Sequence, residues 1–185
     1  STAEAIGAVN TIYLKENKLI GENTDAAGFM ADLKQKTAIT DTEQNPSALI
    51  LGAGGSARAI VYALKNEGWH IALAARRIEQ AEEVAMMFGN VEVVELSERT
   101  LKKLNPHLIV NTTPLGMAPD LDQSPWLDLP LPPNAVIYDL VYNPRETKLV
   151  RDARAQGLSA FTGIGMLIEQ AVRAFEIWTG YCPSH

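Results

Sequence analysis

A short polar segment near the start of the chain carries groups that can do acid–base chemistry. The segment GENTDAAGF spans residues 21–29 and places Asp25 directly before a run of apolar residues at helical spacing that extends to Leu33. The side chain of Thr24 or Asp25 can accept a hydrogen bond from the free amides of the first helical turn, and the helix dipole there favours an ionised carboxylate. Asp25 is therefore either a helix cap or a carboxylate held in place for chemistry.

A glycine-rich turn further along the chain is typical of dinucleotide binding. In LILGAGGSARAI, Gly52, Gly54 and Ala57 follow an apolar run with G-x-G-x-x-G/A spacing. Gly52 permits the tight turn, Gly54 lets the backbone approach a pyrophosphate, and Ala57 allows close helix–strand packing. The amides of the following helix can bind the phosphates. The predicted cofactor loop contains Gly52, Ala53, Gly54, Gly55, Ser56 and Ala57. A glycine-rich turn without a ligand is the alternative.

The end of the next apolar run indicates which dinucleotide is bound. An NAD enzyme usually has Asp or Glu about 20 residues after the fingerprint, where it contacts the ribose 2′-hydroxyl. Here the segment LAARRIEQ has Ala74 and Ala75, followed by Arg76 and Arg77. Guanidinium groups suit a 2′-phosphate, so the segment favours NADP over NAD. The alternative is that both arginines only solvate a loop.

The elements that must position these groups alternate between strands and helices from residue 47 onward. We predict an α/β fold, a Rossmann-like doubly wound parallel sheet with helices on both faces. Expected strands cover residues 47–52, 70–75, 91–96, 108–113, 136–142 and 158–161. Expected helices cover residues 56–67, 78–88, 97–104, 147–157 and 163–180, and a proline-rich loop covers 114–135.

The first 46 residues have a different pattern. Two short strand-like runs over residues 7–21, joined by the polar turn KENK, predict a hairpin. A helix is expected from Thr24 or Asp25 to about Lys36, followed by the linker TAITDTEQNPS. The predicted organisation is a hairpin remnant of a substrate-binding domain (1–24), a connecting helix and linker (25–46), an NADP-binding domain (47–162) and a C-terminal helix that returns toward the substrate cleft (163–185).

Composition excludes several classes of protein. The 185 residues are 46% apolar, 21% charged and 6% aromatic, and the net charge is −6, which argues against a nucleic-acid-binding domain. No apolar run is long enough for a transmembrane helix. The single cysteine, Cys182, excludes an internal disulfide and a cysteine-rich metal site, so a reducing cytoplasm is the simplest setting and no metal is expected. Because the chain begins without methionine or a signal peptide, we expect that a natural N-terminal part is missing.

Six motifs resemble the shikimate dehydrogenase family in order and spacing. They are GAVNT, GENTDAAGF, LGAGGSARA, VNTTPLGM, YDLVYNPRETKL and GIGMLIEQA. The resemblance implies a two-domain enzyme that reversibly reduces 3-dehydroshikimate to shikimate with NADPH, in chorismate and aromatic amino acid biosynthesis. It also implies that roughly the first third of the enzyme lies outside this chain.

The resemblance assigns roles to individual residues. It implies that Asp25 is the catalytic carboxylate and also contacts the substrate, while Asn10, Tyr142 and Gln170 bind the substrate. Asn23 and Thr24 are expected to shape and cap the turn that holds Asp25. As alternatives, Asn10 satisfies backbone groups at a strand end and Gln170 is an exposed helix residue. The residues implied at the cofactor, besides the glycine-rich loop, are Ala75, Arg76, Arg77, Asn111, Thr112, Met117 and Gly165.

The chain departs from the family pattern in two ways. The usual Asn-Arg-Thr after the second strand is Ala75-Arg76-Arg77, so only the central arginine matches. The serine pair that grips the substrate carboxylate and the lysine that partners the catalytic aspartate have no counterpart, and we expect the chain alone to be inactive. A quinate/shikimate dehydrogenase and a non-catalytic NAD(P)-binding sensor on the same fold are alternatives. We expect a small-molecule substrate, no nucleic-acid or membrane partner, and a monomer or homodimer.

Overall fold

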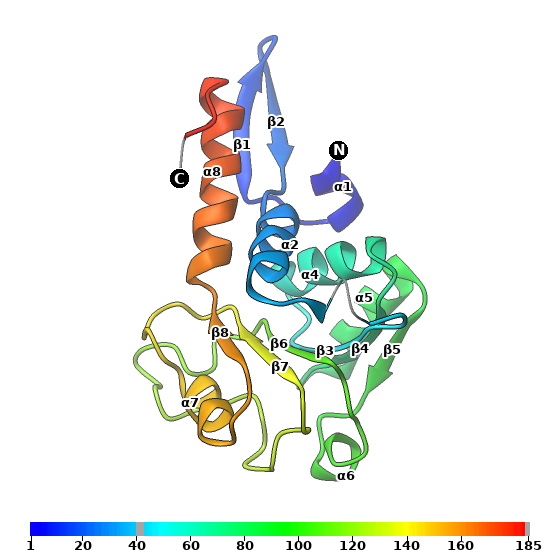
Figure 1. Ribbon diagram of the computed structural model, residues 1–185. Coiled ribbons are helices and arrows are strands. Elements are labelled where there is room, and N and C mark those ends of the chain that lie inside the picture. The colour runs from blue at the N-terminus through cyan, green and yellow to red at the C-terminus, as the bar shows by residue number, and fades with distance from the viewer. Residues whose placement is uncertain (40–42, 184–185) are drawn as a thin grey trace.

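The computed structural model describes residues 1–39 and 43–183, which form a two-stranded hairpin and a six-stranded sheet with flanking helices (Figure 1). The hairpin pairs β1 (Thr11–Lys15) with β2 (Lys18–Glu22). The sheet contains β3 (Ser47–Leu51), β4 (His70–Ala74), β5 (Val91–Val94), β6 (Leu108–Asn111), β7 (Val136–Asp139) and β8 (Ala160–Thr162). The helices include α1 (Thr2–Ile6), α2 (Asp25–Lys36), α4 (Gly55–Asn66), α5 (Ile78–Phe88), α6 (Glu98–Leu101), α7 (Lys148–Ala155) and α8 (Ile164–Thr179).

The sheet has the strand order of a dinucleotide-binding fold. Its order is β5-β4-β3-β6-β7-β8, and every neighbouring pair is parallel. The direction of winding reverses between β3 and β6, and ligands of open α/β sheets bind in the crevice beyond the carboxyl ends of the strands at such a point. Gly52 follows β3 and Thr112 follows β6. The predicted doubly wound α/β fold is therefore confirmed, with the glycine-rich turn at its switch point.

Two apolar cores cover the two faces of the sheet. Ile50, Val110 and Tyr138 point toward the face that is covered by α2, α4 and α5. Leu51 and Ile109 point to the opposite face, where α6, α7 and residues 126–135 pack. Because successive side chains of a strand alternate between faces, burial on both sides requires nearly continuous apolar runs. This requirement explains why the strands were predictable from sequence.

The N-terminal segment differs from the prediction. Residues 2–6 form α1, whereas we expected a strand from Gly7; the first strand begins only at Thr11. Ser1 and Glu4 form a reciprocal capping box at the start of α1, and Gly7 ends it in the left-handed conformation at φ 67°. These end contacts stabilise a helix of one turn, and residues Gly7–Asn10 become a connection that leads into the hairpin.

Helices α2 and α8 pack side by side, and α8 continues along the hairpin (Figure 1). The close contact depends on Gly28, because a Cβ there would lie 2.8 Å from the backbone nitrogen of Gln170. At the other end of α8, the indole nitrogen of Trp178 donates to the Ile12 carbonyl over 2.9 Å. Helix α8 therefore joins the sheet, α2 and the hairpin into one framework.

The linker predicted between α2 and β3 falls partly on residues 40–42, which lie outside the described residues. At its far end, the Ser47 amide donates to Nδ1 of His107 over 3.1 Å, which attaches the start of β3 to the start of β6. The predicted domain boundaries stay a prediction. No helix in residues 1–39 or 43–183 has the length and apolar character needed to cross a membrane.

We predict that Gly28→Ala lowers the free energy of unfolding. Alanine has the higher helix propensity, but its Cβ would collide with the α8 backbone, and overpacking costs about 1–3 kcal/mol against a propensity gain of about 1 kcal/mol. Urea denaturation of the purified chain measures the difference. Gly55→Ala in α4 is the matched control, because the nearest atom to its Cβ would be 3.6 Å away. Equal stability of the two variants would contradict the proposed contact.

Candidate active site

A hollow of about 250 Å³ lies where α2, α4, α8 and the segment after β7 meet. The sequence placed Asn10, Asp25, Tyr142 and Gln170 at the substrate, and the structure brings all four to this hollow. The remaining lining residues are Ser56, Leu140, Gly163, Met166 and Leu167. Five separate segments of the chain thus contribute to one small cavity with both amide and carboxylate groups.

Asn10 is the centre of the polar contacts in the hollow. Its side-chain nitrogen donates to Oδ1 of Asp25 over 2.8 Å and to Oγ1 of Thr24 over 2.9 Å, with Oε1 of Gln170 3.4 Å away. Its oxygen accepts from the Thr24 amide over 2.9 Å. Because the amide donates on one side and accepts on the other, its orientation is determined by its neighbours.

Gln170 is oriented by its own helix. Its side-chain nitrogen donates to the carbonyl of Leu167, one turn earlier in α8, over 2.9 Å. The Oε1 atom is thereby directed toward Asn10 and Thr24, whose hydroxyl donates to it over 3.3 Å. The side chain therefore faces the other polar groups of the hollow, unlike the exposed helix residue that was the alternative interpretation.

The start of α2 is capped differently from the prediction. Thr24 occupies the N-cap position but makes no side-chain cap bond, since its hydroxyl bonds Asn10 and Gln170 instead. Oδ1 of Asn23 accepts from the Ala26 amide over 3.3 Å, and its nitrogen donates to the Ala8 carbonyl over 3.1 Å. The amide of Asn23 thus supplies the cap, which leaves the carboxylate of Asp25 free to face the hollow.

Burial controls the protonation of Asp25. Removal from water raises the pKa of this carboxyl above its ordinary value, and the hydrogen bond from Asn10 opposes that rise. We expected the helix dipole to favour the ionised form, whereas the shift caused by burial favours the protonated form. A carboxyl with a raised pKa holds its proton to higher pH than a solvated aspartate does.

A second cleft, of about 340 Å³, opens at the switch point of the sheet. Its walls include Gly52, Gly54, Arg76, Arg77 and Thr112. Gly52 has φ 115°, and a Cβ there would lie 2.5 Å from Oγ1 of Thr112, so only glycine fits the turn. No atom lies within 4 Å of the Cβ position of Gly54, the N-cap of α4, whose first amides lack a side-chain cap. Open space beside uncapped amides fits a pyrophosphate.

Arg76 and Arg77 lie at the N-terminal end of α5. Arg77 is the N-cap residue and makes no side-chain cap bond, so the first amides of α5 also lack a side-chain partner. Both guanidinium groups are exposed at the wall of the cleft. Guanidinium charge next to free helix amides suits a doubly charged phosphate group.

The other predicted cofactor residues occupy varied positions. Thr112 lines the cleft, and its hydroxyl donates to the Leu51 carbonyl over 2.8 Å. Asn111 is fully buried and donates to Oδ1 of Asp139 over 2.8 Å, so its side chain lies under the cleft wall. Met117 is exposed in the loop after β6, and Gly165 lies against Asp32 in the first turn of α8.

Asp139 is a buried carboxylate that the sequence did not single out. Its Oδ2 accepts from the Thr147 hydroxyl over 2.6 Å, and its Oδ1 accepts from Asn111 and from the Val141 amide. Burial raises the pKa of Asp139, and these hydrogen bonds oppose the rise. The sequence feature that could have identified Asp139 is an aspartate at the end of an apolar strand. This cluster attaches the segments that follow β6 and β7 to each other.

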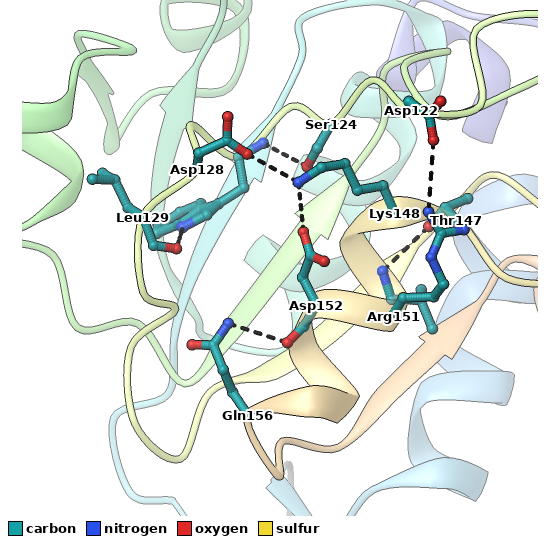
Figure 2. A network of polar contacts seen from close by, with 11 residues as sticks. Asp122, Ser124, Asp128, Leu129, Thr147, Lys148, Arg151, Asp152 and Gln156 are labelled. Carbon is teal, nitrogen blue, oxygen red and sulfur yellow. Dashed lines mark hydrogen bonds and ion pairs between the residues drawn. The ribbon is translucent and has the colours of Figure 1, made fainter.

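A surface network fastens the long connection between β6 and β7 to α7 (Figure 2). The ammonium group of Lys148 lies 2.9 Å from Asp128 and 2.7 Å from Asp152, and Arg151 lies 4.0 Å from Asp122. Hydrogen bonds that Lys148 donates to Asp152 and then to Asp128 raise the pKa of Lys148. Pro125 of the same connection lines the dinucleotide cleft.

A third hollow, of about 480 Å³, lies at the opposite edge of the sheet, beside Ser47, His70 and Asn90. That edge carries the amino ends of the strands, whereas ligands of such sheets bind beyond the carboxyl ends. Among the described residues, no cluster of three or more His, Cys, Asp or Glu could hold a metal ion. We take the hollow of Asp25 and the dinucleotide cleft, to which the two ends of the glycine-rich loop contribute, as the candidate site.

Comparisons with known proteins agree on one family. Residues 163–183 match the model of the shikimate 5′-dehydrogenase C-terminal domain. The chain is 43% identical to the shikimate dehydrogenase (NADP(+)) of Carboxydothermus hydrogenoformans, over 98% of this chain and 65% of the relative. The chain therefore spans less than two thirds of the length of that curated relative.

Solved structures give the same result. The Thermus thermophilus shikimate 5-dehydrogenase in complex with NADP(H) and shikimate matches with a TM-score of 0.83 and 38% identity, over 99% of this chain and 66% of that chain. The quinate dehydrogenase of Corynebacterium glutamicum in complex with NAD matches with a TM-score of 0.86 and 31% identity, over 98% and 66%.

We predict that Asn10→Ala raises the pKa of Asp25 further, because it removes the hydrogen bond that opposes desolvation. The carboxyl group would then stay protonated to higher pH. Carbon-13 NMR titration of the aspartate side chains measures this shift without any assay of activity. Asp139 in the same spectrum is the internal control, since its raised pKa depends on other partners. A fall in the pKa of Asp25, or no change, would contradict the assignment.

Proposed function

The chain belongs to the shikimate dehydrogenase family, and we propose that the protein reversibly reduces 3-dehydroshikimate to shikimate with NADPH. The observation that carries the proposal is the hollow shared by Asn10, Asp25 and Gln170, which also contains Ser56 of the glycine-rich loop. A substrate with several hydroxyl groups matches a cavity lined by two amides and a carboxylate. Its position beside the dinucleotide loop suits hydride transfer between two bound molecules.

NADPH, when bound in the cleft along Gly52 and Gly54, would supply the hydride. The residues of the chain have the tasks of binding and orientation. The amides of Asn10 and Gln170 would hydrogen-bond substrate hydroxyl groups, and Leu140 and Met166 would exclude water from the reacting carbon. Tyr142, which is half exposed at the rim, would close over the substrate.

Reduction of a carbonyl also requires a proton for the developing alkoxide. We assign Asp25 to this part of the reaction, as the carboxylate that orients a proton donor at the substrate oxygen. The family resemblance supplies a lysine as that donor. The described residues that line the hollow include no lysine, so the proposal extends to the whole protein and not to this chain alone.

We further propose NADP as the cofactor, in support of which Arg76 and Arg77 stand where an NAD enzyme usually carries a carboxylate. A cytoplasmic protein that acts as a monomer or homodimer completes the proposal. The single cysteine suits a reducing compartment. The predicted division at residues 24, 46 and 162 into substrate-binding and NADP-binding parts is proposed on the same basis.

Quinate dehydrogenation is the second candidate. It is favoured by the likeness to the Corynebacterium glutamicum quinate dehydrogenase in complex with NAD. The two arginines at the mouth of the dinucleotide cleft favour a 2′-phosphate instead, and for this reason we place shikimate and NADP first.

We predict that Asp25→Asn in the complete protein lowers kcat by roughly 10²–10⁴-fold, the range of general acid–base catalysis, without a change in NADP affinity. The variant keeps the size of the side chain and an oxygen that can accept from Asn10. Shikimate-dependent NADPH formation and NADP titration are the two measurements. Asp120→Asn, at an exposed carboxylate of the loop after β6, is the matched control. Normal turnover by Asp25→Asn would remove Asp25 from the mechanism.

We predict that the double variant Arg76→Ala/Arg77→Ala binds NADP roughly 10- to 100-fold more weakly, because charge-assisted bonds to the 2′-phosphate are lost. Its affinity for NAD should not change, since NAD lacks that phosphate. Isothermal titration with both dinucleotides gives the ratio, and Arg99→Ala, on the exposed surface of α6, controls for loss of general positive charge. Equal weakening for both dinucleotides would refute phosphate recognition by these arginines.

A further inference from the structure

Asp32 is a buried carboxylate that the proposed mechanism does not use. Its side chain belongs to α2 and is 2% exposed. It follows Asp25 by seven residues, which is about two helical turns or roughly 10 Å along the axis, so both face the same side of the helix. Asp32 does not line the hollow of Asp25. A buried carboxylate is costly unless it is hydrogen-bonded, so its partners are informative.

The partner of Asp32 is the hydroxyl group of Tyr138, which donates to Oδ2 over 2.6 Å. Tyr138 is fully buried in β7, and its ring meets Phe29 of α2 edge-on, with centroids 5.1 Å apart. Burial, followed by the bond to Asp32, raises the pKa of Tyr138. The phenol therefore keeps its proton and acts as the donor in this pair.

Helix α8 begins beside this pair, because Gly165 in its first turn lies against the carboxylate of Asp32. Helix α8 follows Gly163, which offers no side-chain cap, and Met166 lies in its first turn. Amides of a first turn have no partner within the helix. The first turn of α8 therefore depends on contacts with the neighbouring elements.

The carboxylate also determines how closely α8 approaches α2. A Cβ at Gly165 would overlap the carboxylate atoms of Asp32, so glycine alone fits there. The first turn of α8 consequently rests on the Asp32 carboxylate, and negative charge at the N-terminus of a helix is favourable. Asp32 therefore bonds to β7 through Tyr138 and contacts α8 at Gly165, so one carboxylate of α2 joins the three elements.

We infer that Asp32 is a positioning residue: oriented by Tyr138, its carboxylate holds the first turn of α8 so that Met166 and Gln170 face the hollow of Asp25. The three linked elements carry the lining of that hollow, since Asp25 begins α2, Leu140 follows β7, and Met166 and Gln170 belong to α8. The kinetic readout of this inference rests on the proposed function.

The kinetic test uses Tyr138→Phe, which removes the linking hydroxyl and keeps the ring. In the complete protein we expect KM for shikimate to rise about tenfold, the effect of one lost hydrogen bond, while the Kd for NADP stays within about twofold. Asp32→Asn retains an acceptor oxygen for Tyr138 and should preserve most of the substrate affinity, whereas Asp32→Ala should behave like Tyr138→Phe.

Phe29→Leu is the matched control for loss of core packing. It disturbs the same ring contact and leaves the polar link in place. An equal rise in KM for Phe29→Leu and Tyr138→Phe, or an unchanged KM in Tyr138→Phe, would overturn the inference, because packing alone or neither group would then account for the site.

Hydrogen exchange at the Leu167 amide, which closes the first turn of α8 by donating to the Gly163 carbonyl over 2.9 Å, provides a readout that needs no catalysis. Tyr138→Phe should speed exchange of this amide about tenfold, and Phe29→Leu should not. If this difference is seen in a protein without shikimate-dependent NADPH formation, the positioning role holds and the proposed function fails. If the enzyme is active but Tyr138→Phe leaves exchange at Leu167 unchanged, the positioning role fails and the proposed function stands.

Discussion

The close approach of α2 to α8 is the constraint on which the rest of the site depends. Gly28 leaves no room for a side chain against the backbone of Gln170, and Gly165 leaves none against Asp32. These two glycines, one on each helix, determine how close the helices lie and how they are aligned along their length. As a result Asp25 and Gln170, which lie far apart in sequence, project into the same cavity.

Buried polar groups then attach this helix pair to the sheet. The phenol of Tyr138 connects α2 to β7, and the carboxylate of Asp139, the next residue, joins the segments after β6 and β7. Successive residues of one strand point to opposite faces, so the two clusters lie on opposite sides of the sheet. The carboxyl end of β7 is thereby fixed from both faces, directly beneath the cavity and the dinucleotide cleft.

The fold was predictable where one physical rule dominated. Strands buried on both faces must be apolar throughout, and the turn at Gly52 must be glycine, so both left clear patterns. The short helix before Gly7 was not predicted because its stability comes from contacts at its two ends. The prediction of Thr24 as a side-chain cap was wrong because its hydroxyl bonds residues that are distant in sequence. Asp32 has the spacing of an ordinary helix residue. Only the tertiary structure brings Tyr138 to it.

The hydrogen bond from Trp178 to the Ile12 carbonyl spans 166 positions of sequence, and the contact between Asn10 and Gln170 spans 160. The ribosome synthesises the amino-terminal partners of both contacts long before α8. Until α8 is synthesised, the hairpin and the α8-facing side of α2 have no helix to pack against, while the strands of the sheet already have neighbours to pair with. Assembly of the cavity must therefore wait for α8, which is synthesised after the other elements that line it.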